Sequence, residues 1–293
     1  MREQQETEYK KQGYLQESFQ IFHLSDGLLK EVPFHYHEFL KIFVLIRGNV
    51  SYIIEGKEYG LHPYDIVLID AGEIHRPIIH DHNGYERVII YLSPDFLNHY
   101  KKENLQKCFQ KEPEKDSHVI RYSKEKLPFP MQGLMTIAKV SCQNIYAENL
   151  LQKCRLLEFL IFINNTAASQ NNSYVTPVSQ NENILKILQY INSHLTQDLS
   201  VSKIADAVHL NRSYLMHKFK EETGYTLKEF ITEKRLFLAT GDIRNGVSPT
   251  DACYRSGFSN YSSFYRAYVG KYGYSPKKQK EHMPQFPNLP RKE

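Results

Sequence analysis

The stretch Leu199-Ser200-Val201-Ser202-Lys203-Ile204-Ala205 has a counterpart 48 positions later, Val247-Ser248-Pro249-Thr250-Asp251-Ala252-Cys253. The correspondence continues beyond these seven residues. Ser200 to Leu210 spans ten positions, as does Ser248 to Phe258, and Phe219 to Gly224 spans five, as does Tyr268 to Gly273. The second copy carries one extra residue before Phe264. A repeat of this length predicts one supersecondary unit built twice.

Each copy is expected to form two short helices. In the first copy, Ser200 suits the N-cap of a helix through Val208, and Asn211 can cap a second helix from about Arg212 to Thr223, which stops at Gly224. The apolar residues would share one small core: Ile204, Ala205, Val208, Leu210, Leu215 and Phe219. Two short helices packed in this way form a helix-turn-helix, whose second helix can enter a DNA major groove.

The second copy follows the same plan, with Ser248 and Ser259 as the expected caps. Between the copies, Leu227 to Arg244 predicts one helix capped by Thr226. A helix of that length spans on the order of 25 Å, and it could hold two reading helices about one DNA turn, roughly 34 Å, apart. Their exposed faces are expected to carry Ser213, Tyr214, Met216, His217 and Lys218 in the first copy, and Asn260, Tyr261, Ser262, Tyr265 and Arg266 in the second.

These residues carry a resemblance to a known family. Gly257-Phe258-Ser259-Asn260-Tyr261-Ser262-Ser263-Phe264-Tyr265-Arg266, followed by Gly273-Tyr274-Ser275-Pro276, resembles the DNA-binding domain of the AraC/XylS family of bacterial transcription regulators. The similarity covers about 100 residues, Glu182 to Lys280. It implies DNA contacts by Arg212, Ser213, Met216 and His217 in the first unit and Tyr261, Ser262, Tyr265 and Arg266 in the second. Lys218 lies on the same expected face and completes the candidate set.

The second unit departs from the family pattern at several positions. The family usually has larger apolar residues at Ala252 and Ser256, and polar residues at Val269 and Gly270. We therefore expect sequence discrimination to depend more on the first unit than on the second.

The N-terminal part is patterned as short strands. Apolar runs separated by turn residues predict strands at 41–47, 50–54, 57–61, 66–69, 74–79 and 85–92, after a polar arm over residues 1–20. Strands at this spacing are typical of a β-sandwich or barrel. The fold class expected for the whole chain is α and β multidomain: an N-terminal cupin-like antiparallel β-barrel, a helical dimerisation or linker segment, and a C-terminal all-α domain with two helix-turn-helix units.

Two helices and a linker are expected between these parts. Gln132 to Asn164 is helical in pattern, and Leu150, Cys154, Leu157 and Ile161 recur at spacings of 4, 3 and 4, which is one helical stripe. The stripe either covers the β-domain or pairs with a second copy of the chain. The predicted domains are 1–130 for effector binding, 131–175 for the helical segment and linker, and 176–293 for DNA binding.

Composition and charge narrow the class of protein. From Val175 onward the chain has 17 basic and 11 acidic residues, a net charge of +6, whereas the first 174 residues carry −2. A basic C-terminal part fits a polyanionic partner. No segment is apolar and long enough to predict a membrane span or a secretion signal. The four cysteines show neither metal-ligand nor disulfide spacing, so a reducing cytoplasmic location is expected.

Histidines in the strand region form a second pattern. His35-Tyr36-His37, then Lys41, then His75 resembles the metal motif of cupin barrels, in which a Glu stands where this chain has Lys41. Because a lysine removes a ligand and adds a like charge, we expect no bound metal and no cofactor. A pocket lined by these histidines without metal, or histidines bonded only within the barrel, both remain open.

The resemblance implies that a small polar effector, commonly a sugar, binds such a domain. The candidate effector residues are His35, His37, Lys41, Tyr52, His75 and Tyr91, since tyrosines offer stacking faces and hydroxyls. Lys41 with neutral histidines could equally hold a carboxylate or a phosphate.

The sequence thus favours a homodimeric, effector-controlled regulator that binds double-stranded promoter DNA, contacts RNA polymerase if it activates, and is not an enzyme. The alternatives are a cupin-type metalloenzyme fused to a DNA-binding module, and an effector-independent regulator with a structural barrel.

Overall fold

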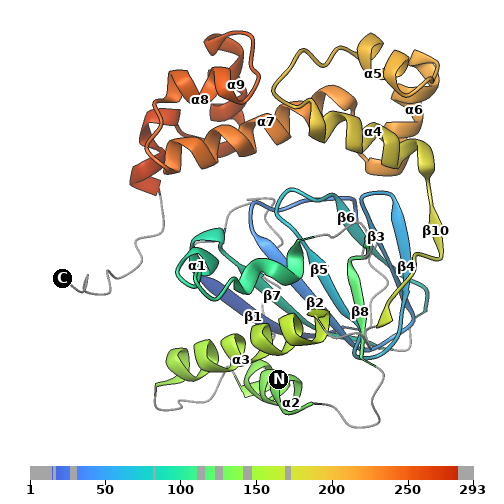
Figure 1. The fold of residues 1–293 in the computed structure, drawn as a ribbon, viewed down its shortest axis with the longest axis vertical. Helices are drawn as coiled ribbons and strands as arrows, with labels where there is room; N and C mark the ends of the chain where they lie inside the picture. The colour runs from blue at the N-terminus through green and yellow to red at the C-terminus, as the bar shows by residue number, and fades with distance from the viewer. Residues whose placement is uncertain are drawn as a thin grey trace.

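The structure, a computed structural model, describes residues 15, 18–26, 32–81, 84–110, 116–122, 128–140, 147–168 and 173–282. A strand-rich N-terminal part and a helical C-terminal part lie one above the other, with α2 and α3 on the side of the strands away from the helical part (Figure 1). Most of the predicted N-terminal arm, positions 1–14 and 16–17, lies outside the described residues. The arm ends earlier than expected, because a strand begins at Phe19.

The strands form two antiparallel sheets. The six-stranded sheet has the order β1-β7-β2-β5-β8-β9, and the four-stranded sheet has the order β10-β4-β3-β6. The strands are β1 (Phe19–Asp26), β2 (Leu40–Arg47), β3 (Val50–Ile54), β4 (Lys57–Leu61), β5 (Ile66–Ile69), β6 (His75–Ile79), β7 (Tyr85–Leu92), β8 (Val119–Arg121), β9 (Ser173–Tyr174) and β10 (Ser179–Gln180). The six predicted strands are all present, within one residue at each end, because their turns are marked by glycine and polar residues.

Strand β2 explains how the N-terminal part divides its core. Successive side chains of a strand point to opposite faces. Phe43 and Leu45 therefore join the core between the two sheets. Ile42 and Val44 face the other way, into a core shared with helices. Since both faces are covered, β2 reads as a nearly continuous apolar run.

Four helices of the described residues cover the outer face of the larger sheet. They are α1 (Pro94–Asn98), the 3-10 helix η1 (Leu105–Phe109), α2 (Phe129–Val140) and α3 (Glu148–Ala168). The residues of α3 that pack on the sheet are Leu156, Phe159, Leu160 and Ile163. Of the predicted stripe, Leu150, Cys154 and Ile161 are instead exposed, and Leu157 is half-buried. The interpretation that this stripe covers the β-domain is therefore wrong, because α3 is apolar on two faces.

The helical part confirms the doubled unit. Its helices are α4 (Glu182–Ser193), α5 (Val201–Ala207), α6 (Arg212–Thr223), α7 (Leu227–Arg244), α8 (Pro249–Arg255) and α9 (Tyr261–Tyr272), followed by the 3-10 helix η2 (Pro276–His282). α5–α6 and α8–α9 are the two units, and α7 joins them (Figure 1). No helix of the described residues combines the length and hydrophobicity needed to span a membrane.

Helix caps explain the bounds of both units. The side chains of Ser200, Asn211 and Ser248 accept backbone N–H bonds at the starts of α5, α6 and α8, as predicted. The prediction of Ser259 as the cap of α9 is wrong. Asn260 caps that helix, and its side chain accepts from Ser263 N at 2.8 Å. The extra residue before Phe264 lengthens the second turn by one position and moves the cap with it.

We predict that Gly257→Ala destabilises the helical part much more than Gly246→Ala. Both glycines have positive φ, +92° and +94°, but a Cβ at Gly257 would lie 2.8 Å from two backbone atoms, Leu195 O and Thr196 Cα, whereas a Cβ at Gly246 meets nothing within 4 Å. Urea denaturation should show a loss of at least about 3 kcal/mol for Gly257→Ala and about 1 kcal/mol for Gly246→Ala. Equal losses would contradict the close approach.

Candidate functional site

The six predicted effector residues lie together in the interior of the β-domain. The ring centroids of His35 and His37 lie 4.4 and 5.2 Å from that of His75. Tyr91 is 5.5 Å from His37, and Tyr52 is 6.0 Å from His75. We call His35, His37 and His75 the histidine cluster. Two separate segments supply it, the stretch before β2 and the start of β6.

The side chain of Lys41 lies against the histidine cluster. Its Nζ donates to the Tyr52 hydroxyl at 3.0 Å and lies 3.4 Å from His75 Nε2. Among the residues that the structure describes, no carboxylate forms an ion pair with Lys41. Burial is the main cause that lowers the pKa of Lys41 to about 7, and Arg87 adds to it by charge repulsion. In its charged form, a buried lysine without a carboxylate partner attracts an anion.

The pKa values of the three imidazoles in the cluster are lowered, like that of Lys41. Burial lowers the pKa of His35 to about 4 and holds the pKa values of His37 and His75 well below their usual range. The charge of Lys41 is the second cause for all three. The rings are therefore neutral at pH 7 and present nitrogen lone pairs. Their ligand nitrogens all lie within 4.8 Å of one another, so the three residues could hold a metal ion.

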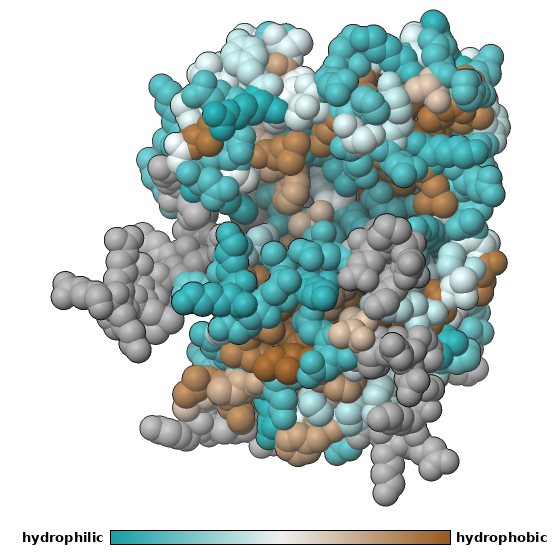
Figure 2. Space-filling model, in the orientation of Figure 1, coloured by the Kyte–Doolittle hydropathy of each residue, from teal (hydrophilic) through white to brown (hydrophobic). Residues whose placement is uncertain are grey.

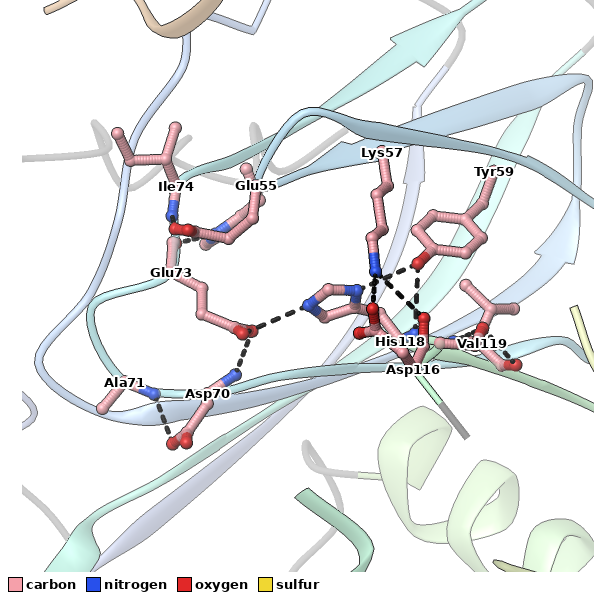
Figure 3. Close-up of polar contacts among 12 residues, drawn as sticks. Glu55, Lys57, Tyr59, Asp70, Ala71, Glu73, Ile74, Asp116, His118 and Val119 are labelled. Carbon is pink, nitrogen blue, oxygen red and sulfur yellow. Dashed lines mark hydrogen bonds and ion pairs between the residues drawn. The ribbon is translucent and has the colours of Figure 1, made fainter. Parts of the chain in front are cut away.

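A second layer of polar contacts fixes the loop that leads into His75. Glu73 Oε1 pairs with His118 Nε2 at 3.1 Å, and His118 Nδ1 lies 3.1 Å from the Tyr59 hydroxyl (Figure 3). Glu55 accepts from Ile74 N at 2.9 Å (Figure 3). The backbone on either side of His75 is thus held by three strands or loops, which positions its ring.

The cluster is closely packed. Of the six predicted effector side chains, five are buried and His35 is half-buried. Two hollows among the described residues, each with a volume of about 500 Å³, lie away from the cluster. One is lined by β3, β4 and the stretch from β9 up to β10, with Ser51, His62 and Val178 among the lining residues. The other lies between the β3–β4 turn and α6, near Gly56 and Glu222. A ligand larger than an ion or a small acid would have to displace side chains of the cluster.

The residues between the cluster histidines hold the helical part, which sequence reasoning missed. The Tyr36 hydroxyl donates to Glu233 of α7 and accepts from Lys271 of α9 at 3.1 Å. Glu38 is only 2% exposed; it accepts from the Tyr272 hydroxyl and pairs with Lys271 at 3.3 Å and with Arg244 at 3.6 Å. We call these contacts the domain joint. The alternation of His with Tyr and Glu over residues 35–38 is the signal that could have revealed it.

The predicted DNA-contacting residues fall on two exposed helix faces. On α6, Arg212, Ser213, Met216 and His217 are exposed, while Lys218 is half-buried and pairs with Glu221 and Glu222 at 3.2 and 2.8 Å. On α9, Ser262, Tyr265 and Arg266 are exposed. Tyr261 is half-buried, because its ring packs on Phe264 at 5.6 Å. Lys218 and Tyr261 therefore also serve the structure of their own units.

Comparison with known families gives two matches. Residues 24–124 match an AraC-like ligand binding domain, and residues 204–282 match a helix-turn-helix domain. The chain belongs to the AraC family of transcription regulators. The first match contains the histidine cluster, and the second contains both exposed helix faces. The AraC resemblance read from the doubled pattern is confirmed.

The chain is also similar, at low sequence identity, to curated relatives and to a solved structure. The uncharacterized HTH-type transcriptional regulator YbfI of Bacillus subtilis is 22% identical over 240 residues, which cover 80% of this AraC-type chain and 82% of the relative. The HTH-type transcriptional activator RhaS of Enterobacter sp. is 23% identical over 255 residues, covering 84% and 86%. The crystal structure of ToxT from Vibrio cholerae bound to (E)-4-(8-methylnaphthalen-1-yl)but-3-enoic acid is 17% identical, with a TM-score of 0.38 over 91% of this chain and 99% of ToxT.

Proposed function

We infer that this AraC-type regulator is a homodimer that binds double-stranded promoter DNA under the control of a small polar ligand at the histidine cluster. The observation that carries the proposal is the double role of residues 35–38, which line the cluster on one side and hold the DNA-binding part on the other. Promoter DNA as the partner places the protein in the cytoplasm, and an activating role would add RNA polymerase as a partner.

The two exposed helix faces are the proposed DNA contacts. Arg212, Ser213, Met216 and His217 would meet one major groove segment, and Ser262, Tyr265 and Arg266 the next. Arg266 offers the planar guanidinium that reads guanine in a bidentate manner. Lys218 and Tyr261 contribute through the positions of their helices, because their side chains are partly occupied.

A small acid fits the cluster better than a sugar. The buried ammonium of Lys41 forms no ion pair with a described carboxylate, and a ligand carboxylate or phosphate would supply one. The close packing also favours a compact ligand. A sugar remains the second candidate, with the hydroxyls of Tyr52 and Tyr91 as its polar partners.

The outward stripe of α3 is the proposed dimer contact. Leu150 is 61% exposed and Ile161 is 50% exposed, and they belong to a series with spacings of 4, 3 and 4 that matches the seam of a helix pair. Figure 2 shows hydrophobic surface over the lower part of the molecule, where α3 lies. The stripe is self-complementary in an antiparallel arrangement, so a second copy of the chain is the occupant.

The alternatives from the sequence receive less support. A cupin-type metalloenzyme would need an open catalytic cavity, and the cluster is closely packed. A purely structural barrel would not need an ammonium buried beside three imidazoles, which costs stability unless a ligand repays it. We therefore propose a regulator without enzymatic activity.

We predict that Arg266→Ala lowers discrimination between the target promoter and unrelated DNA by about 1–3 kcal/mol, the loss typical of a base-contacting arginine. Lys102→Ala, an exposed position of the β-domain, removes the same charge and should leave discrimination unchanged. Fluorescence anisotropy with specific and nonspecific duplexes at fixed salt measures both. Equal discrimination by Arg266→Ala and wild type would exclude a base contact.

We predict that Ile161→Glu converts the dimer to a monomer, because a carboxylate in an apolar helix seam is left desolvated. Asn98→Glu, at the exposed end of α1, is the matched control. Sedimentation over a range of concentrations should show the shift for Ile161→Glu alone. A wild-type monomer, or a dimeric Ile161→Glu, would contradict this use of the stripe.

We predict that some members of a panel of small carboxylic and phosphoric acids raise the melting temperature of the full chain, by about 5 °C or more near saturation. Lys41→Met should abolish the rise, since it removes the cation, whereas Lys102→Met should keep it. Neutral sugars form the second panel. A rise with sugars alone, retained in Lys41→Met, would replace the acid by a sugar.

A further inference from the structure

Each of the two helix-turn-helix units has its own buried core. The buried apolar residues of the helical part form two clusters, one with α4, α5 and α6 and the other with α8 and α9. α7 runs past both units (Figure 1). It contributes Leu227, Phe230 and Ile231 to the first cluster and Leu236, Ala239 and Ile243 to the second. The two clusters share no residue, so the relative position of the units depends on α7 and on the contacts beside it.

Arg235 lies on α7 between the residues of the two clusters. Its Nε donates to Leu195 O at 2.9 Å, and its Nη2 donates to Gln197 O at 2.5 Å. Both carbonyls belong to the loop between α4 and α5. Because a guanidinium is planar and its donors are rigidly spaced, two such bonds fix the loop in both distance and rotation relative to α7.

The turn of the second unit packs on the same loop. Gly257 lies between α8 and α9, and a Cβ at this position would lie 2.8 Å from Leu195 O and Thr196 Cα and 3.0 Å from Arg235 Nε. The approach is close enough that only a glycine fits without a shift of the backbone. Loop, turn and guanidinium therefore meet at one place. We call Leu195, Thr196, Gln197, Arg235 and Gly257 the inter-unit contact.

The inter-unit contact and the domain joint lie on different sides of α7. Glu233 accepts from the Tyr36 hydroxyl of the β-domain. Arg235 is two positions further along, which turns it by about 200° around the helix axis and toward the α4–α5 loop. The domain joint takes its helical residues from α7 and α9. The inter-unit contact adds the segment that leads into the first unit, so it relates that unit to the second.

The relation between the units matters because a DNA target is stiff. Two reading helices on one face meet groove segments about one turn, roughly 34 Å, apart. One base pair inserted between these segments moves the second by about 3.4 Å along the axis and rotates it by about 35°. A protein with fixed units loses contacts on such a target. A protein with mobile units can follow the change, but it binds the matched target less tightly.

We propose that Arg235 is a positioning residue for DNA recognition, which holds the α4–α5 loop against the α8–α9 turn and so sets the one spacing of groove segments that the protein accepts. The use of α6 and α9 as readers rests on the proposed function, whereas the fixed relation between the units stands on the inter-unit contact alone. Arg235 is half-buried with its donors on the loop, so it acts through the positions of the two reading helices.

The first test measures the relation between the units without DNA. Spin labels are attached to Lys220→Cys on α6 and Gly270→Cys on α9, both exposed positions, in the full chain with Cys142→Ser and Cys154→Ser. Dilution with unlabelled chain restricts the measured distances to one molecule. With Arg235 present the distance distribution should be narrow, and Arg235→Met should widen it at least about twofold, since small contacts between units otherwise allow relative motion. Equal widths overturn the proposal.

The second test measures the accepted spacing. A duplex selected from a random pool by the full chain is compared with the same duplex carrying one inserted base pair between the two segments that the protein protects from cleavage. The insertion should lower the affinity of wild type at least about tenfold, and that of Arg235→Met less than about threefold. Lys228→Met, an exposed position of the same helix, removes the same charge and should show the wild-type penalty.

Arg235→Lys separates the planar fork from the charge. It keeps the cation but has a single donor nitrogen, so it should tolerate the insertion as Arg235→Met does. A wild-type penalty in Arg235→Lys overturns the proposal. So does a uniform loss of affinity by Arg235→Met for both duplexes, which indicates a merely structural role. If no duplex is selected, the proposed function fails, and the spin-label distances still decide whether Arg235 fixes the units.

Discussion

The period-two geometry of one extended segment determines how the parts of this protein meet. From His35 to Leu45, every second residue points into the space between the two sheets, and the residues between them point to helices. The helices change along the segment. Tyr36 and Glu38 meet α7 and α9, whereas Ile42 and Val44 meet α2 and α3 and their neighbours. One strand and the residues before it therefore connect the histidine cluster, the helical part and the helices that cover the larger sheet.

The domain joint is specific because it is polar and buried. Glu38 is shielded from water, and its charge is tolerated only with Lys271, Arg244 and the Tyr272 hydroxyl in place. An apolar contact of similar size would allow many relative positions of the two parts. Burial, with the charge of Glu38 next, raises the pKa of Tyr272 well above its usual range, so this hydroxyl stays a donor.

Local patterns in the sequence predicted most of the elements but not their docking. Strand bounds and three of the four caps of the two units follow from turn and cap residues, which act within a few positions. The prediction of Ser259 as a cap is wrong because nothing in the neighbouring residues shows that the second turn is one residue longer than the first. Helix α3 has two apolar faces, and the predicted stripe is the exposed one. Leu156 and Phe159 belong to the buried face, which the spacing of the stripe does not include. Glu38 could not be assigned from the sequence, because its partners lie more than 200 positions away.

Residues 173–181 connect the strand-rich part to the helical part, and we call them the linker. β9 pairs with β8 in one sheet, and β10 pairs with β4 in the other, so the linker is attached to the β-domain at two points. Only Asn181 separates β10 from α4. Asn181 itself donates its backbone N–H to Gly56 O at 3.1 Å and caps α4 with its side chain, so the connection between the two parts has almost no slack. Any change in the position of the helical part relative to the strands must therefore break contacts of Asn181 or β10 with the β-domain.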